Sequence, residues 1–366
     1  MEEKMYSEST MADVNVSATE TVDVNATVKR QRKTFSKVGM GFFIMTVVIM
    51  VFQMTVIGVV SYLWPDFYAE YTNVIGLLPI SIIGFPAYFI MNKIFESAPA
   101  IEQKHKFTGK HLFLFILISF GVMWVGNLVA TLINMGVAAA ANKEATTVVS
   151  TLLSNSALWQ NLIMVAIIAP ILEEFLFRKL IIDKLSRFGE GVAILVSAVM
   201  FGLYHGNIVQ LIYAAMLGLV LGYVYSKTRK IHYTIIIHML INFFSGVFGS
   251  WVISVTNYGE IQSKIVELQA AGDMTAVGEY TMAHMGQMVG YIGYVGLMGT
   301  VNIAGLVLFI VTLVRYIKRG QMLLPGVEKL VKGKKFATVA LNVGMILFAV
   351  AWIGMTIFSL IGSYFI

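Results

Sequence analysis

Long apolar runs separated by short charged segments dominate this sequence. Of its 366 residues, 58% are hydrophobic and only 13% are charged, whereas about a quarter of an ordinary soluble domain is charged. So few charges do not cover a soluble globule of this length, but helices in a bilayer need charge only at their ends. The composition therefore excludes a soluble enzyme, a secreted disulfide scaffold and a disordered chain. The absence of cysteine also excludes thiolate catalysis and cysteine-ligated zinc.

Apolar runs of roughly 17 to 25 residues predict about nine membrane spans, and hence an all-α, polytopic helix bundle over residues 38–366. The predicted spans are Val38–Trp64, Asn73–Ile94, Leu112–Ala140, Trp159–Ile182, Val192–His205, Val209–Tyr225, Tyr233–Ser254, Gly290–Val314 and Ala337–Phe365. Residues 1–37 lack the apolar core of a signal peptide and predict a disordered cytoplasmic tail. Segment 257–287 is too polar to cross the membrane and predicts an outer amphipathic helix or a lid.

The distribution of basic residues predicts the orientation of these spans. All but two of the 26 Lys and Arg fall on one side of the map, and the exceptions are Lys143 and Lys264. Because Lys and Arg are enriched in cytoplasmic loops, we expect the N-terminus inside the cell and the C-terminus outside. The net charge of +6 is then explained by membrane anchoring at the bilayer surface, and nucleic acid is not an expected partner.

A small set of polar groups lies inside the predicted spans. An ionisable side chain in the bilayer costs roughly 2.5 to 3.5 kcal/mol, so those retained there are candidates for function. The set falls on the spans between residues 159 and 254 and comprises Glu173, Glu174, Arg178, His205, His238 and Asn242. One reading makes these groups structural hydrogen-bonding partners between helices. The other makes them a hydrolytic site with a base, imidazoles and donors for an oxyanion.

Helical spacing separates the two glutamates. Residues four apart share a helix face, so Glu174 faces Arg178, and the pairs Phe201–His205 and His238–Asn242 are spaced in the same way. Glu173 points about 100° away from Glu174 on a helix of 3.6 residues per turn. We therefore expect Glu174 to pair with Arg178 and Glu173 to meet groups from other helices.

Two further features shape the predicted site. Pro170 lacks a backbone N–H and is expected to kink the helix beside Glu173. His205 lies too far along its span to share the depth of Glu173, so we expect the turn at Gly206 and Asn207 to be buried inside the bundle. Gly218 and Gly222 would let the following span pack closely.

The motifs EExxxR, FxxxH and HxxxN follow one another on three spans, as Glu173-Glu174-Arg178, Phe201-His205 and His238-Asn242. In this order they resemble the CPBP (Abi) family of intramembrane proteases, which includes the type II CAAX prenyl endopeptidases and bacteriocin-immunity relatives. The resemblance covers residues 155–250 of the chain. It implies an eight-helix-type core with a cavity open to the cytosol, in which membrane-associated peptide substrates are hydrolysed. A bacterial plasma membrane is the expected location.

The resemblance also implies roles for the residues. Glu173 is implied as the general base that activates water, with His205 as its partner and His238 and Asn242 as oxyanion donors. Glu174, Arg178 and Phe201 are implied as supporting residues. One oxyanion donor contributes about 2.7 to 4 kcal/mol to a transition state.

The sequence leaves alternatives open for both the cofactor and the function. Histidine and glutamate also bind catalytic zinc, with Glu173, His205 and His238 as the candidate ligands, but the HExxH spacing is missing and we favour a mechanism without metal. The competing functions are a non-catalytic bacteriocin-immunity or binding protein and a proton-coupled transporter that uses the same groups as a relay. Nothing in the sequence selects one substrate or one oligomeric state.

Overall fold

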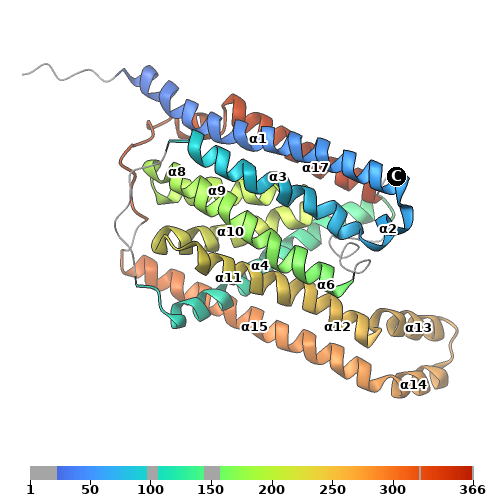
Figure 1. The fold of residues 1–366 in the computed structure, drawn as a ribbon. Helices are drawn as coiled ribbons and strands as arrows, with labels where there is room; N and C mark the ends of the chain where they lie inside the picture. Colours follow the sequence, from blue (N-terminus) through green and yellow to red (C-terminus); the bar gives the residue numbers. More distant parts are fainter. Residues whose placement is uncertain (1–22, 97–105, 144–156, 321–322, 365–366) are drawn as a thin grey trace, which may run out of the picture.

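The computed structural model describes residues 23–96, 106–143, 157–320 and 323–364, and every regular element in these residues is a helix. The long helices run roughly side by side in one bundle (Figure 1). The first half contains α1 (Val24–Leu63), α2 (Pro65–Glu70), α3 (Thr72–Ile94), α4 (Gly109–Ala140), α6 (Leu158–Asn161), η1 (Leu162–Ile168), α7 (Ala169–Glu173), η2 (Glu174–Ile182), α8 (Asp183–Leu185) and η3 (Ser186–Phe188). The second half contains α9 (Glu190–Leu203), α10 (Ile208–Thr228), α11 (Ile231–Asn242), η4 (Phe243–Phe248), α12 (Gly249–Thr256), α13 (Tyr258–Ala270), α14 (Met274–Ala283), α15 (Met285–Lys318), α16 (Lys335–Val339) and α17 (Val343–Tyr364).

Seven helical segments in the described residues are long and apolar enough to cross a membrane: α1, α3, α4, α10, the run from α11 to α12, α15 and α17. The protein is therefore a multi-pass membrane protein with a polytopic helical bundle. The other two predicted spans correspond to the run 158–185, which is divided among five short elements, and to α9, which is only 14 residues long. Neither segment is among the seven, so the total of nine spans stays a prediction. The two segments carry Glu173 and Phe201.

Helix α1 begins earlier than the sequence suggests. The tail was expected to reach residue 37, but α1 starts at Val24, and only residues 1–22 of that tail lie outside the described residues. The Asp23 side chain caps the helix by accepting hydrogen bonds from the N–H groups of Asn25 and Ala26. Phe35 is fully buried and its ring stacks on Phe188, so tertiary packing holds this polar extension in the helix.

Glycines allow the closest contacts between helices. A side chain at Gly344 of α17 would collide with the Ser36 carbonyl of α1, and one at Gly305 of α15 would collide with the backbone of α4. On α10, Gly218 faces Ala198 of α9 and Gly222 faces Ile194. The close packing predicted for the Gly218–Gly222 face is therefore confirmed.

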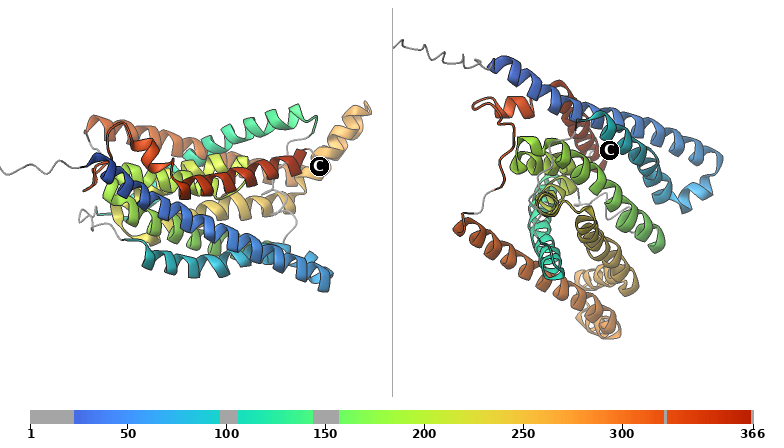
Figure 2. Two further views of the ribbon diagram at one scale, coloured as in Figure 1. Left: turned by 90° about the horizontal axis from the view of Figure 1, so that it is seen from above. Right: turned by 60° about the vertical axis from the view of Figure 1, so that its left-hand side comes forward.

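The run 158–185 lies at the centre of the bundle. It packs against α3, α9, α10 and α11, with α1, α3 and α17 on one side of the molecule and α4 and α15 on the other (Figure 2). Its η2 segment is almost wholly buried, and Leu176, Phe177 and Leu180 are inaccessible to solvent. Polar side chains on this run are therefore held in a rigid, apolar environment.

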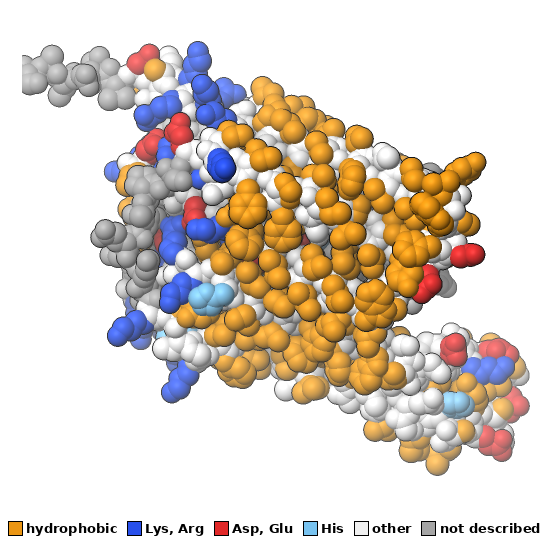
Figure 3. Space-filling model, in the orientation of Figure 1, with side chains coloured by type: hydrophobic (Ala, Val, Ile, Leu, Met, Phe, Trp, Pro, Cys, Tyr) orange, Lys and Arg blue, Asp and Glu red, His pale blue; other side chains and the backbone are white. Residues whose placement is uncertain are grey.

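The surface separates apolar from charged side chains. A broad apolar belt covers the middle of the bundle, and Lys and Arg gather at the end where α1 begins (Figure 3). Segment 257–287 forms α13, α14 and the beginning of α15, and the α13–α14 hairpin projects beyond the opposite end (Figure 1). The segment is therefore helical, and whether it serves as an outer amphipathic helix or as a lid stays open. The first described residues and the C-terminus lie at opposite ends of the bundle, and the orientation in the membrane stays a prediction.

Candidate active site

Ahead of Glu173, the central run contains a segment with π-helical instead of α-helical hydrogen bonds. Residues 162–168 form a π-helical segment in which the N–H of Ala169 donates to the carbonyl of Met164, five residues back. In the same register the Val165 carbonyl would accept from residue 170, which is a proline without an N–H. The Asn242 side chain supplies the missing donor, with Nδ2 2.9 Å from the Val165 oxygen. At Pro170, where a kink was predicted, the helix thus has a π-helical segment, and the Asn242 side chain from α11 bonds its free carbonyl.

Glu174 and Arg178 form a buried ion pair. Arg178 Nε lies 3.2 Å from Glu174 Oε2, and both side chains are inaccessible to solvent. This is the pairing that the spacing of four residues predicts. The guanidinium also stacks on Phe201, with Cζ 4.2 Å from the ring centroid. Phe201 of the second motif therefore contacts the first motif directly.

Glu173 has different surroundings from its neighbour. Its side chain is 16% exposed, against 0% for Glu174. Nε2 of His238 on α11 lies 3.5 Å from Glu173 Oε2, which is an ion pair when the imidazole is protonated. The expected pairing of Glu174 with Arg178 and the expected contact of Glu173 with another helix are both present, but Glu174 also reaches α11 through His238.

His238 bridges the two glutamates. Its Nδ1 lies 2.9 Å from Glu174 Oε1, and because a carboxylate accepts, this nitrogen carries a proton. The other nitrogen is thereby directed at Glu173. Phe201 packs at a right angle to the ring, 5.7 Å between centroids. The orientation of His238 is set by a carboxylate behind it, which is the usual way in which proteins fix a functional imidazole.

His205 lies on the turn after α9. Its Nδ1 donates to the Phe201 carbonyl at 2.8 Å, which leaves Nε2 as an acceptor, and its ring packs against Phe201 with centroids 4.9 Å apart. Glu173, His238 and Arg178 are the charged groups that act on it electrostatically. The resemblance implied His205 as the partner of Glu173, and that role stays a prediction. Among the described residues, the imidazole within 4 Å of the Glu173 carboxylate is that of His238.

The turn that carries His205 is buried, as expected from the mismatch in depth. Gly206 is buried with a φ of +63°, a conformation that favours glycine. Trp352 and Met355 of α17 lie over it, and the ring of Trp352 also packs on Tyr204, 4.7 Å between centroids. Helix α17 thus closes the site on this side.

Two tyrosines near the site were missed by sequence reasoning. Tyr204 and Tyr213 are both within electrostatic range of Glu173. Tyr204 had a signal, because it immediately precedes His205 in the chain. Tyr213 had none, since its approach depends on how α10 folds back after the turn.

Glu173, His205 and His238 are the candidate metal ligands. Among the residues that the structure describes, no three or more side chains of His, Cys, Asp or Glu are arranged to hold an ion. Nδ1 of each histidine is engaged with protein, at Phe201 for His205 and at Glu174 for His238.

The described geometry defines a buried acid–imidazole cluster in a helical membrane bundle. Residues 155–244 match the family model described as type II CAAX prenyl endopeptidase Rce1-like. The segment that carries the three motifs is therefore similar to the family that those motifs resemble.

One relative extends the comparison. The Bacillus subtilis protein named "Putative membrane peptidase YdiL" is 32% identical over 115 residues. The match covers 30% of this chain and 45% of that protein, so the chain spans less than half the length of the relative. No solved structure shows a significant match.

Proposed function

We propose that this protein is an intramembrane endopeptidase that hydrolyses a peptide bond of a membrane-associated substrate with water activated by Glu173. The observation that carries the proposal is the partly exposed Glu173 carboxylate facing His238 beside a wholly buried Glu174–Arg178 pair. A base must reach its water, whereas groups that only position it do not. The match of this segment to a peptidase family supports the same conclusion.

In the proposed reaction Glu173 takes a proton from water, and the hydroxide attacks the carbonyl carbon of the scissile bond. Nε2 of His205 accepts a hydrogen bond and orients the same water, since Nδ1 is occupied by Phe201. Glu173 then returns its proton to the leaving amine. The balance is one water consumed and one peptide bond broken, with Glu173 restored.

The developing oxyanion needs donors. His238 with protons on both nitrogens keeps its bond to Glu174 and offers the Nε2 proton, and Asn242 offers the amide proton not used by Val165. Both residues lie on α11, one turn apart. Two contacts hold α11 in place, His238 with Glu174 and Asn242 with the Val165 carbonyl, and they present the two donors together.

The test is peptide release from candidate membrane substrates in reconstituted vesicles. Glu173→Gln keeps the shape of the side chain but removes the base, so we expect a loss of roughly 10²- to 10⁴-fold in rate. His205→Ala should also lose activity. The matched controls Glu260→Gln and His232→Ala change exposed residues outside the site and should retain it. Activity that survives metal chelation would support the mechanism without metal, with zinc on Glu173, His205 and His238 as the alternative.

Other outcomes identify the competing functions. Full cleavage by Glu173→Gln would contradict the proposed base. Immunity activity undiminished by both site variants would identify a binding protein, and proton-coupled uptake without cleavage would identify a transporter. Comparing membrane peptides from cells with wild type and with Glu173→Gln would then reveal the substrate as a peptide that accumulates only with the variant.

A further inference from the structure

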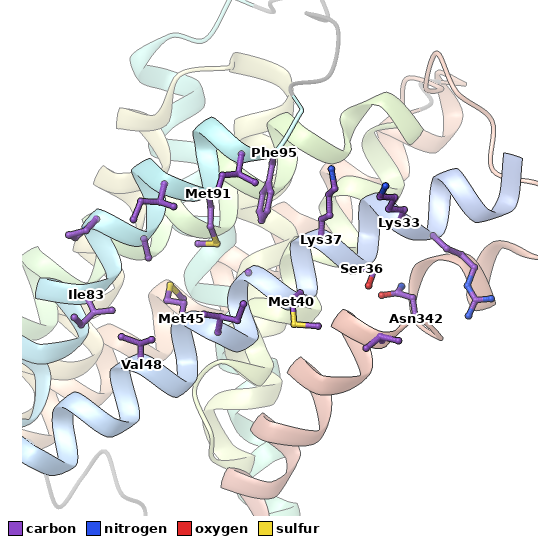
Figure 4. Close-up of a pocket in the computed structure, with 18 of the residues that line it drawn as sticks. Lys33, Ser36, Lys37, Met40, Met45, Val48, Ile83, Met91, Phe95 and Asn342 are labelled. Carbon is purple, nitrogen blue, oxygen red and sulfur yellow. The ribbon is translucent and has the colours of Figure 1, made fainter. Parts of the chain in front are cut away.

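A large groove opens on the outer face of the bundle, away from the glutamate–histidine site. It has a volume of about 1150 Å³ and lies between α1 and α3, with Asn342 and Val343 at one end. Figure 4 shows Met40, Met45 and Val48 of α1 along its length, opposite Ile83 and Met91 of α3. This volume slightly exceeds that of usual small-molecule sites, which measure about 300 to 1,000 Å³.

The chemistry of the groove changes along α1. Its first part is basic and contains the exposed residues Lys29, Arg32, Lys33 and Lys37. From Met40 to Val48 the lining is apolar. At 1.5 Å per residue, the distance from Lys37 to Val48 is about 16 Å, roughly half of a 30 Å hydrocarbon core. The groove therefore matches a molecule with an anionic head and an apolar tail as long as one leaflet is thick.

Three lysines of the basic part form no ion pair with another described residue. Within the described part of the chain, neither Lys29, Lys33 nor Lys37 forms an ion pair. Arg30, on the same helix but outside the groove, is paired with Glu328 at 3.2 Å. These lysines lie on one face of α1 next to the apolar part of the groove, so their positive charge is available to bind an anionic ligand.

We propose that this groove binds one anionic diacyl phospholipid of the phosphatidylglycerol class. Its phosphate lies at Lys29, Lys33 and Lys37, and an acyl chain lies between α1 and α3. Charge complementarity selects the lipid, because a wholly apolar occupant would leave the lysines unused. Each basic residue near the membrane surface strengthens anionic lipid binding about fivefold.

The position of the groove gives the lipid a structural role. Helix α3 lines it on one face and packs on the central run with the other, where Gly84 contacts Leu172 and the rings of Tyr88 and Phe175 lie 5.2 Å apart. A lipid wedged between α1 and α3 would hold α3 against the helix that carries Glu173. This proposal does not depend on the proposed peptidase activity.

The test is native mass spectrometry of the full-length protein in detergent, titrated with dioleoyl phosphatidylglycerol. We expect one site that is saturated first, with much weaker binding of dioleoyl phosphatidylcholine and no competition by glycerol 3-phosphate. The triple variant Lys29→Gln, Lys33→Gln, Lys37→Gln should bind phosphatidylglycerol on the order of 100-fold more weakly. The control triple Lys332→Gln, Lys334→Gln, Lys335→Gln removes three exposed charges outside the groove and should bind as wild type does.

A second pair of variants tests the apolar part. Val48 lines the groove and is 45% exposed, whereas its neighbour Val47 is 42% exposed and does not line it. Val48→Trp should weaken phosphatidylglycerol binding, and Val47→Trp should not. Equal binding of the two lipids, or equal loss in both lysine triples, would overturn the proposal. A copurifying apolar peptide displaced by Val48→Trp, with no effect of the lysines, would identify a different occupant and also overturn it.

Discussion

Adjacent carboxylates at positions 173 and 174 differ because of what surrounds each of them. Glu174 is inaccessible and meets both Arg178 and His238, so its negative charge is compensated on two sides. Removing two charges from water is expensive, and a buried pair of this kind is weak evidence for stability in itself. The pair instead serves to position side chains, because it holds Arg178 on the ring of Phe201 and His238 beside Glu173.

Breaking the pair on one side should destabilise the protein strongly. We expect Arg178→Met to lower the free energy of unfolding by about 3 to 5 kcal/mol, because Glu174 would keep a buried charge with half of its compensation. The double variant Glu174→Gln, Arg178→Met should recover part of that loss. Unfolding in detergent measures both, and a double variant as unstable as the sum of the single variants would contradict this account.

A surface pair provides the control for this measurement. Lys264 and Glu267 lie 2.7 Å apart, but their side chains are 44% and 67% exposed. Lys264→Met should change the free energy of unfolding by no more than about 1 kcal/mol, since solvent screens an exposed pair.

At the scale of elements, the register change in η1 links two helices. A proline in a regular helix leaves an unbonded carbonyl, and in the described structure the carbonyl of Val165 is bonded by Asn242 of α11. Sequence reasoning predicts a disturbance at Pro170 but not its form, because hydropathy carries no signal that separates a kink from a π-helical segment. It also assigns Asn242 only to the oxyanion, and the structural hydrogen bond is an additional role.

The link between Pro170 and Asn242 can be measured as an interaction energy. Asn242→Ala should cost about 0.6 to 1.7 kcal/mol in the wild-type background, the range for hydrogen bonds between membrane helices. In a Pro170→Ala background the new N–H can bond Val165, so the cost should be smaller. A double-mutant cycle of unfolding free energies measures the difference, and strictly additive costs would show that the two residues are not coupled.

On the scale of the whole molecule, charge distribution predicts how the bundle lies in the membrane. The basic end carries the beginning of α1, and the α13–α14 hairpin projects from the other end. The positive-inside rule then places the hairpin outside the cell.

The chain has no cysteine, so single cysteines report this orientation without background. Ser263→Cys on α13 should react with a membrane-impermeant maleimide in intact cells. Lys332→Cys, near the basic end, should react only after the cells are permeabilised. The opposite pattern would reverse the orientation, and the unlabelled wild-type protein is the control.

The sequence predicts contacts between residues close together in the chain better than contacts between separate helices. The Glu174–Arg178 pair is local, and helical geometry alone predicts it. The contact of His238 with Glu173 joins α11 to the central run, and spacing within one helix does not specify how two helices face each other. The groove between α1 and α3 was likewise out of reach, because its lysines look like ordinary membrane anchors until α3 is placed beside them.

The bridge made by His238 has one more consequence. A single imidazole touches both carboxylates, so a small turn of α11 about its own axis would withdraw it from Glu173 and Glu174 together. Both contacts of the imidazole would then be lost in one movement. A compound that binds α11 from the lipid side and holds it in the turned position is then expected to reduce the proposed peptidase activity from outside the site.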